Sequence, residues 1–125
     1  MDTNKFVKTL INATRKGKIE WSPVPRKYFD LITNLSSGIV DAYYADYKDD
    51  TSVVIYQFKS FDSFSGTEEI NHYISIVDEN FRYKYEIPPV EFEEVRGEVF
   101  QFYREIQKSA NKIDEFFEGF MNDFE

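Results

Sequence analysis

The sequence predicts an α+β domain with a helix at the N-terminus, an antiparallel β-meander of about five strands and a long helical tail. Apolar residues near the N-terminus recur at helical spacing, the middle of the chain consists of short β-rich runs between turn residues, and helical spacing returns in the last third. With 125 residues, the chain is predicted to form one domain, residues 1–125.

The first helix is predicted to run from about Thr3, as its N-cap, to Lys16, and Gly17 then offers a left-handed stop. Its apolar face consists of Phe6, Val7, Leu10 and Ile11. A short extended piece, Lys18 to Trp21, follows and ends before two prolines. Because Trp21 is large and comes directly after a helix stop, we expect it to fill the core between helix and sheet rather than bind a ligand.

The meander is expected to be antiparallel because each connector, such as the Ser36-Ser37-Gly38 turn, is too short to contain a crossover helix. The predicted strands are Tyr28–Thr33, Ile39–Tyr47, Ser52–Phe61, Ile70–Val77 and Phe81–Ile87. The third is apolar on much of both faces, which indicates a central position. The fifth alternates, with an expected buried face of Phe81, Tyr83, Tyr85 and Ile87 and an expected wet face of Arg82, Lys84 and Glu86.

The period is helical again from Val90, and from Val95 to Phe124 apolar residues advance in steps of three and four and form one helical stripe. One long helix satisfies this pattern, and so do two helices with a bend near Ser109–Asn111. Flanking apolar residues make the stripe wider than a coiled-coil seam requires. We therefore expect the tail to be covered, either by the sheet of its own subunit or by a second subunit.

Composition excludes several classes of protein. Without cysteine, the chain has no disulfide, no thiolate metal site and no cysteine nucleophile, and a reducing compartment is the simpler interpretation. Residues 1–10 contain no continuous apolar core of a secretion signal, and no stretch reaches the roughly 18 apolar residues that a membrane span needs. We expect a cytoplasmic protein that does not enter a membrane.

Charge is distributed unevenly along the chain. The net charge is −8, but residues 1–27 carry seven basic and two acidic side chains, which gives +5 there and −13 in the rest. The overall charge disfavours nucleic-acid binding, because cationic contacts to phosphates supply most of that affinity. The basic N-terminal part is either a docking surface for an oppositely charged partner or a solvated helix face in which Arg15 and Lys16 complement the helix dipole.

One set of residues points to enzyme chemistry. Asp41 near the start of one predicted strand and Gln57-Phe58-Lys59 on the next resemble the core of the PD-(D/E)xK nuclease superfamily. The resemblance implies that Asp41 and Gln57 hold Mg²⁺ and that Lys59 assists the attacking water. Gln57 stands where that family has a second carboxylate, and a strand rather than a helix is predicted after Lys59.

Other polar residues have a structural interpretation. His72, the only histidine, is predicted to be structural rather than a catalytic base. We expect Asp46, Asp49 and Asp50 to form a solvated turn rather than a cation site. The acids Glu91, Glu94 and Glu98 are expected on one helical face, where they complement the dipole. The sequence has no glycine-rich nucleotide motif, so we expect no cofactor and no resident metal. Two interpretations stay open, surface and core, for Tyr43, Tyr44 and Tyr47.

In outline, the chain resembles small uncharacterised bacterial and phage proteins. The matching features are the TRKGKIEW segment from Thr14 to Trp21, the aromatic meander and the acidic closing helix. The resemblance implies no activity. We expect a non-catalytic protein-binding or regulatory domain of a bacterial or phage accessory protein, with a protein partner or a homodimer. The alternatives are the Mg²⁺-dependent nuclease and an acidic nucleic-acid mimic that inhibits a DNA-binding protein.

Overall fold

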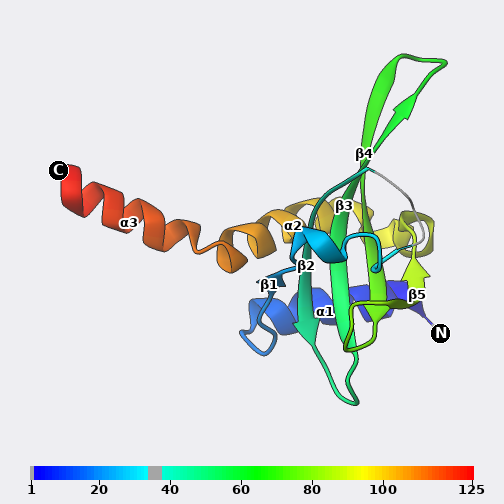
Figure 1. Cartoon of the computed structure of the whole chain (residues 1–125), viewed down its shortest axis with the longest axis horizontal. Coiled ribbons are helices and arrows are strands. Elements are labelled where there is room, and N and C mark those ends of the chain that lie inside the picture. The colour runs from blue at the N-terminus through cyan, green and yellow to red at the C-terminus, as the bar shows by residue number, and fades with distance from the viewer. Residues whose placement is uncertain (1, 34–37) are drawn as a thin grey trace.

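One antiparallel sheet, with strand order β1-β2-β3-β4-β5, organises an α+β fold (Figure 1). A computed structural model describes residues 2–33 and 38–125. The strands are β1 (Ser22–Pro23), β2 (Ile39–Asp46), β3 (Ser52–Asp62), β4 (Thr67–Val77) and β5 (Tyr83–Ile87). The helices are α1 (Thr3–Arg15), α2 (Arg96–Ala110) and α3 (Ile113–Phe124), with 3₁₀ segments η1 (Arg26–Tyr28) and η2 (Pro89–Val95). The predicted fold class is confirmed.

The first helix forms almost as predicted, but its cap is one residue earlier. Asp2 Oδ1 accepts a hydrogen bond from the Lys5 backbone N–H at 3.0 Å, so Asp2 rather than Thr3 is the N-cap. Gly17 follows the helix with φ +76°, the left-handed conformation that ends many helices. The buried stripe of α1 consists of Val7, Leu10 and Ile11.

Trp21 fills the core between helices and sheet, which confirms its predicted role. Its ring is 7% exposed and packs edge-on against Phe102, with ring centroids 6.2 Å apart. Its indole N–H donates to Thr14 Oγ1 at 3.0 Å, so the polar atom of the buried ring is satisfied.

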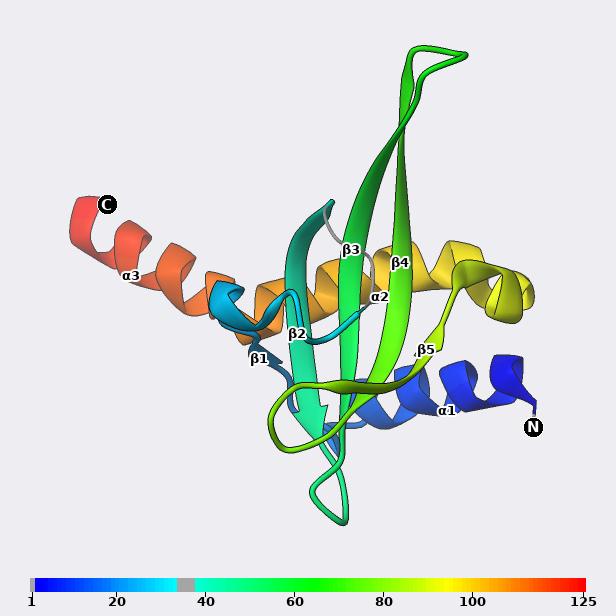
Figure 2. The ribbon, with the colours of Figure 1, turned by 45° about the vertical axis from the view of Figure 1, so that its right-hand side comes forward.

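The predicted strand at Tyr28–Thr33 is wrong. Instead, β1 pairs with the edge of β2, with Ser22 opposite Tyr44 and Pro23 opposite Tyr43. The extended piece predicted for Lys18 to Trp21 thus continues two residues further than expected. The strap, which we define as residues 24–33, turns through η1 and crosses the other face of the sheet (Figure 2). Its apolar residues pack on that face rather than pairing in the sheet, and these are Val24, Tyr28, Phe29 and Ile32. Aromatic and β-branched content alone does not distinguish a strand from such a packed loop.

The third strand is central and covered on both sides, as predicted. Val54, Ile55 and Tyr56 are each 0% exposed. Ile55 belongs to the core beneath α1 and α2, whereas Val54 and Tyr56 belong to the core beneath the strap. The sheet therefore separates two apolar clusters. In the following connector, the Ser36 and Ser37 part of the predicted turn lies outside the described residues, and Gly38 has φ +103°.

The expected alternation of the fifth strand is wrong in two respects. Phe81 lies in a turn with φ +64°, and Tyr83 and Tyr85 of this edge strand are 42% and 49% exposed. Glu86 is not fully wet, because it lies half-buried against the strap and accepts hydrogen bonds from Thr33 and Tyr56.

The C-terminal tail consists of two helices. After η2, α2 packs on the sheet, and the chain breaks at Lys112, which adopts φ +54°. Of the two predicted possibilities, the bend near Ser109–Asn111 is therefore confirmed. Asn111 Nδ2 donates to the Tyr43 hydroxyl at 3.0 Å and fixes the end of α2 on β2. The first part of the stripe is buried, whereas the second part leaves the body (Figure 1).

Candidate interaction surface

One face of α3 is an exposed apolar surface. Every residue of α3 is described, and none of them is buried. Exposure of the large side chains ranges from 47% at Met121 to 75% at Phe124. The exposed side chains are Phe116, Phe117, Phe120, Met121 and Phe124, which share one side at a spacing of three and four residues. A monomeric soluble protein rarely leaves such a face uncovered.

The aromatic rings of this face are packed on one another rather than on the body. The Phe120 and Phe124 centroids lie 4.8 Å apart, and those of Phe116 and Phe120 lie 6.2 Å apart. At the junction with α2, Lys108 Nζ lies 3.7 Å from Asp114 Oδ1. Both ribbon views show α3 projecting away from the sheet (Figures 1 and 2).

The other side of α3 is acidic. Four carboxylates, and no basic residue, occur between Ile113 and Phe124. They are Asp114, Glu115, Glu118 and Asp123. At 100° per residue, Glu115, Glu118 and Asn122 lie opposite the aromatic rings. The helix is thus an apolar ridge bordered by negative charge.

A second apolar surface is a groove of about 470 Å³ between α1 and the ends of β2 and β3. Apolar side chains make up most of its lining. The lining residues are Phe6, Thr9, Leu10, Ala13, Lys18, Ile19, Glu20, Ala45, Asp46, Tyr47 and Val53. Phe6 also lines a neighbouring apolar hollow, together with Ile76, Tyr85 and Ile87. We call the two hollows together the α1 groove.

The floor of the α1 groove is a row of side chains across four strands. Ala45 pairs with Val53, Val53 with Ile76, and Ile76 with Tyr85. Residues paired across antiparallel strands point to the same face, so all four lie on the helix-covered face. Neighbouring strands are about 4.8 Å apart, and the row is therefore about 14 Å long.

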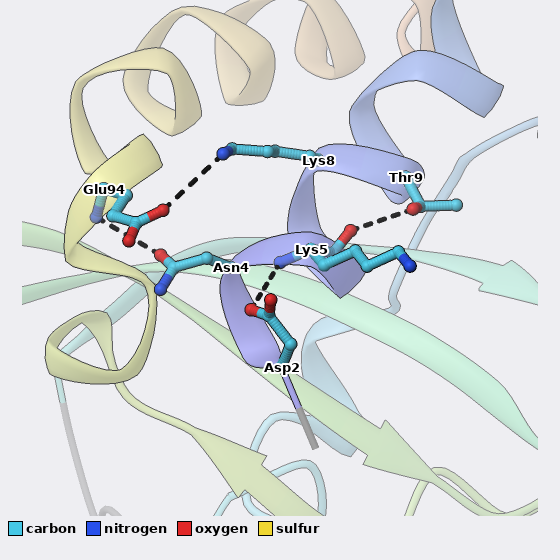
Figure 3. Close-up of polar contacts among 6 residues, drawn as sticks. All are labelled: Asp2, Asn4, Lys5, Lys8, Thr9 and Glu94. Carbon is cyan, nitrogen blue, oxygen red and sulfur yellow. Dashed lines mark hydrogen bonds and ion pairs between the residues drawn. The ribbon is translucent and has the colours of Figure 1, made fainter.

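The two sides of α1 differ in how their charges are satisfied. Lys8 Nζ lies 3.6 Å from Glu94, and Arg15 makes a bidentate ion pair with Glu105 of α2, with a shortest distance of 2.8 Å. Figure 3 shows the Lys8 side chain directed toward Glu94, whereas the side chains of Lys5 and Thr9 point away from Glu94. Exposed lysines on the groove side, Lys5, Lys16 and Lys18, form no ion pair within the described part of the chain.

The predicted nuclease residues lie on the helix-covered face, at the other end of the sheet from the α1 groove. Asp41 pairs with Gln57 across β2 and β3, and Lys59 is two residues further along the same face. Asp41 Oδ1 lies 3.7 Å from Arg26, and Lys59 Nζ lies 3.1 Å from Glu68. Residues 2–33 and 38–125 include no group of three or more acidic or histidine side chains arranged to hold a metal ion. The nuclease role of Asp41, Gln57 and Lys59 stays a prediction.

His72 is structural, in keeping with its predicted role. It is 3% exposed and packs between Phe100 and Tyr103, with ring centroids 4.6 and 4.5 Å away. Burial lowers the pKa of His72 to about 4, so the ring is neutral at pH 7. The Gln57 side-chain nitrogen lies 3.4 Å from His72 Nε2.

The two acidic sets have different outcomes. Asp46, Asp49 and Asp50 form an exposed turn, as predicted, in which Asp46 Oδ1 accepts from Ser52 at 2.8 Å. The expected shared helical face of Glu91, Glu94 and Glu98 is wrong. The first two lie in η2 and the third lies in α2, with a non-helical residue, Phe92, interrupting the run.

The tyrosine cluster divides between core and surface. Tyr43 is buried and packs edge-on to Tyr103, and Tyr44 packs edge-on against Phe81 beneath the strap. Tyr47 is 70% exposed and lines the α1 groove. A further exposed apolar element is the tip of the β3–β4 hairpin, which carries Phe61 and Phe64.

Comparisons of the chain with protein-family models, curated proteins and solved structures found no match. Among the helices of the described segments, none combines the length and apolar character that crossing a membrane requires. The α1 groove could not be predicted from the sequence, because its floor is formed by residues of four strands. Which of these residues lie side by side depends on the register of the strands. The α3 face was visible as part of the apolar stripe, but its exposure was not.

Proposed function

We propose that this chain is a non-catalytic protein-binding domain that acts by inserting α3 into an apolar groove of another polypeptide. The observation that carries the proposal is the projecting helix with five large apolar side chains exposed on one face. Amphipathic helices are recognised in this way, through anchors spaced three and four residues apart. Phenylalanine and methionine are common in such contacts because they bring large apolar area.

The charge of α3 defines the kind of groove that it fits. Its polar side holds four carboxylates, which favours a groove bordered by basic side chains. The same acids disfavour a membrane surface, because helices that lie in anionic membranes are basic on the polar side. A protein partner with a positive rim is therefore the ligand that the helix suits best.

A photo-crosslinking experiment tests the proposal in living cells. A photoreactive amino acid replaces Phe120 on the apolar face in one full-length variant, and Asn122 on the opposite side in a matched control. We expect protein adducts from position 120 and far fewer from position 122. Equal labelling from both positions, or no protein adduct from position 120, would refute the proposed function.

A further inference from the structure

We propose that the groove that receives α3 is the α1 groove of a second copy of this chain, so that two copies exchange their C-terminal helices reciprocally. This inference rests on the proposed function, because it names the partner of α3. It is carried by three relationships: the dimensions of the two surfaces, their opposite charge and the geometry of the α2–α3 connection.

The dimensions of helix and groove agree. From Phe116 to Phe124, the apolar ridge of α3 is about 12 Å long at 1.5 Å per residue. The floor of the α1 groove, from Ala45 to Tyr85, spans four strands and is about 14 Å long. A helix laid beside α1 would thus cover the row, with Phe6 and Ile19 on its flank.

The sheet also has a partly exposed end beside α1 where such a helix fits. On β2, Tyr103 of α2 donates to the carbonyl of Asp41, and the groove begins at Ala45, four residues further along the strand. That separation is about 13 Å. The helices α2 and α1 cross this face one after the other (Figure 2), and the row beside α1 keeps half-buried Val53 and Ile76 and exposed Tyr85, whereas Ala45 is already buried.

The charges of the two surfaces are complementary. On the helix there are four carboxylates, and three lysines beside the groove, Lys5, Lys16 and Lys18, form no ion pair within the described residues, although the carboxylates Glu20 and Asp46 also line it. Lys18 lines the groove itself, and Lys5 and Lys16 are exposed along α1. By contrast, two α3 helices pairing through their apolar faces would offer no basic side chain to Asp114 and Asp123, the carboxylates that flank the ridge.

A chain cannot place α3 in its own groove. Only Asn111 and Lys112 separate α2 from α3, and the three Cα–Cα steps from Ala110 to Ile113 span about 11 Å at most. The groove lies on the far side of α1 from α2, about two helix-packing distances, or roughly 16–20 Å, from the axis of α2. A second copy can supply the helix without this restriction.

The area available is sufficient for a stable dimer. Five large side chains, each about half exposed, supply on the order of 500 Å² of apolar surface per helix. Reciprocal exchange covers two helices and two grooves, and because each groove exposes roughly half as much surface as a helix, the total is about 1,500 Å², close to the about 1,600 Å² of a standard protein interface. Exchange also closes the assembly at two copies, since each ridge and each groove is then occupied.

Sedimentation equilibrium of the full-length chain and four variants tests the inference. Phe120→Asp removes an anchor from the ridge, and Asn122→Asp adds the same charge on the opposite side of α3. Ala13→Glu adds a charged side chain to the groove, and Asn12→Glu adds the same charge at the neighbouring exposed position. Circular dichroism first verifies that each variant is folded.

We expect a dimer for the unmodified chain, Asn122→Asp and Asn12→Glu. Phe120→Asp and Ala13→Glu should each raise the dissociation constant about thirtyfold or more, the effect of losing a central anchor. A mixture of these two variants should form dimers again, because one intact ridge then meets one intact groove.

Two results would overturn the inference and would leave the proposed function standing. One is a dimer that is lost in Phe120→Asp and kept in Ala13→Glu, which would mean that α3 pairs with α3. The other is a monomer in solution that still crosslinks to a different protein from position 120. A monomer without any protein adduct from position 120 would refute both proposals.

Discussion

The phenolic hydroxyl of Tyr56 donates a hydrogen bond to the carboxylate of Glu86 between the sheet and the strap. Glu86 also accepts from the Thr33 hydroxyl, at the end of the described strap. Burial, and the neighbouring carboxylate after it, raise the pKa of Tyr56, so this donor keeps its proton. One carboxylate on β5 thus connects the strap to the central strand β3.

Replacing Tyr56 by Phe tests this connection. We expect a loss of about 1–2 kcal/mol in the free energy of unfolding, because the half-buried carboxylate of Glu86 loses the hydroxyl donor of Tyr56. Urea denaturation measures the effect. The control is Tyr85→Phe, whose ring is 49% exposed, and it should change stability by less than about 0.5 kcal/mol. Equal effects of the two substitutions would argue against a specific role of the bond.

Gly38 is predicted to be the glycine least tolerant of a side chain. Its φ is +103°, and a Cβ atom there would lie 2.6 Å from the Lys59 carbonyl oxygen, which is backbone and cannot move aside easily. We expect Gly38→Ala to lower the free energy of unfolding by about 2 kcal/mol or more. Gly119→Ala is the matched control because it has free space in a helix and should be neutral or slightly stabilising. An unchanged denaturation midpoint in Gly38→Ala would contradict this prediction.

His72 makes stability depend on pH in a defined direction. Its pKa is about 4 in the folded protein, and the ordinary value is 6.5. Between these values, the unfolded chain binds a proton that the folded chain does not, so the contribution is fully present above pH 6.5 and is lost as pH falls toward 4. We expect up to about 3 kcal/mol from this group.

Denaturation curves at pH 7 and pH 4 measure this contribution. Carboxyl groups also titrate in this range. The informative quantity is therefore the difference in free energy of unfolding between the unmodified chain and His72→Gln. That difference should shift in favour of the variant at pH 4. A difference that is the same at both pH values would show that His72 does not titrate on unfolding.

Charge at the groove is expected to affect association modestly. Lys18→Glu places a negative charge where acidic α3 is proposed to dock, and we expect the dimer dissociation constant to rise about two- to fivefold. The control is Lys27→Glu, which makes the same charge change near Tyr28 on the strap side of the sheet. Sedimentation equilibrium measures both, and a larger effect at Lys27 than at Lys18 would contradict the proposed docking site.

Periodicity predicted the elements whose residues repeat regularly. The stripe of α1 and the two-sided apolar pattern of Val53 to Phe58 sufficed to predict a helix and a central strand. The strap was mistaken for a strand because Tyr28, Phe29 and Ile32 are apolar whether they pair in a sheet or pack on it. Periodicity reports how apolar a segment is, and it does not report against what the segment packs.

The same limit applies to the candidate site. The stripe through Val99, Phe102 and Ile106 continues without interruption to Phe124, but only its first half meets the sheet. The break depends on the left-handed conformation of Lys112, for which no glycine or proline gives a signal. Glu86 was expected to be solvated because the alternation of its own strand indicates only which side the residue faces. The pattern does not indicate that the hydroxyl groups of Tyr56 and Thr33 cover that side.

Intermolecular paramagnetic relaxation tests the exchange of α3 most directly. Because the chain contains no cysteine, Asn122→Cys provides a single attachment point for a nitroxide on the polar side of α3. The labelled variant is mixed with ¹⁵N-labelled unmodified chain, so that only signals of the second copy are observed. We expect broadening of the amide signals of Ala13, Ile19 and Val53 around the α1 groove. Broadening confined to α3, or none at all, would contradict the account.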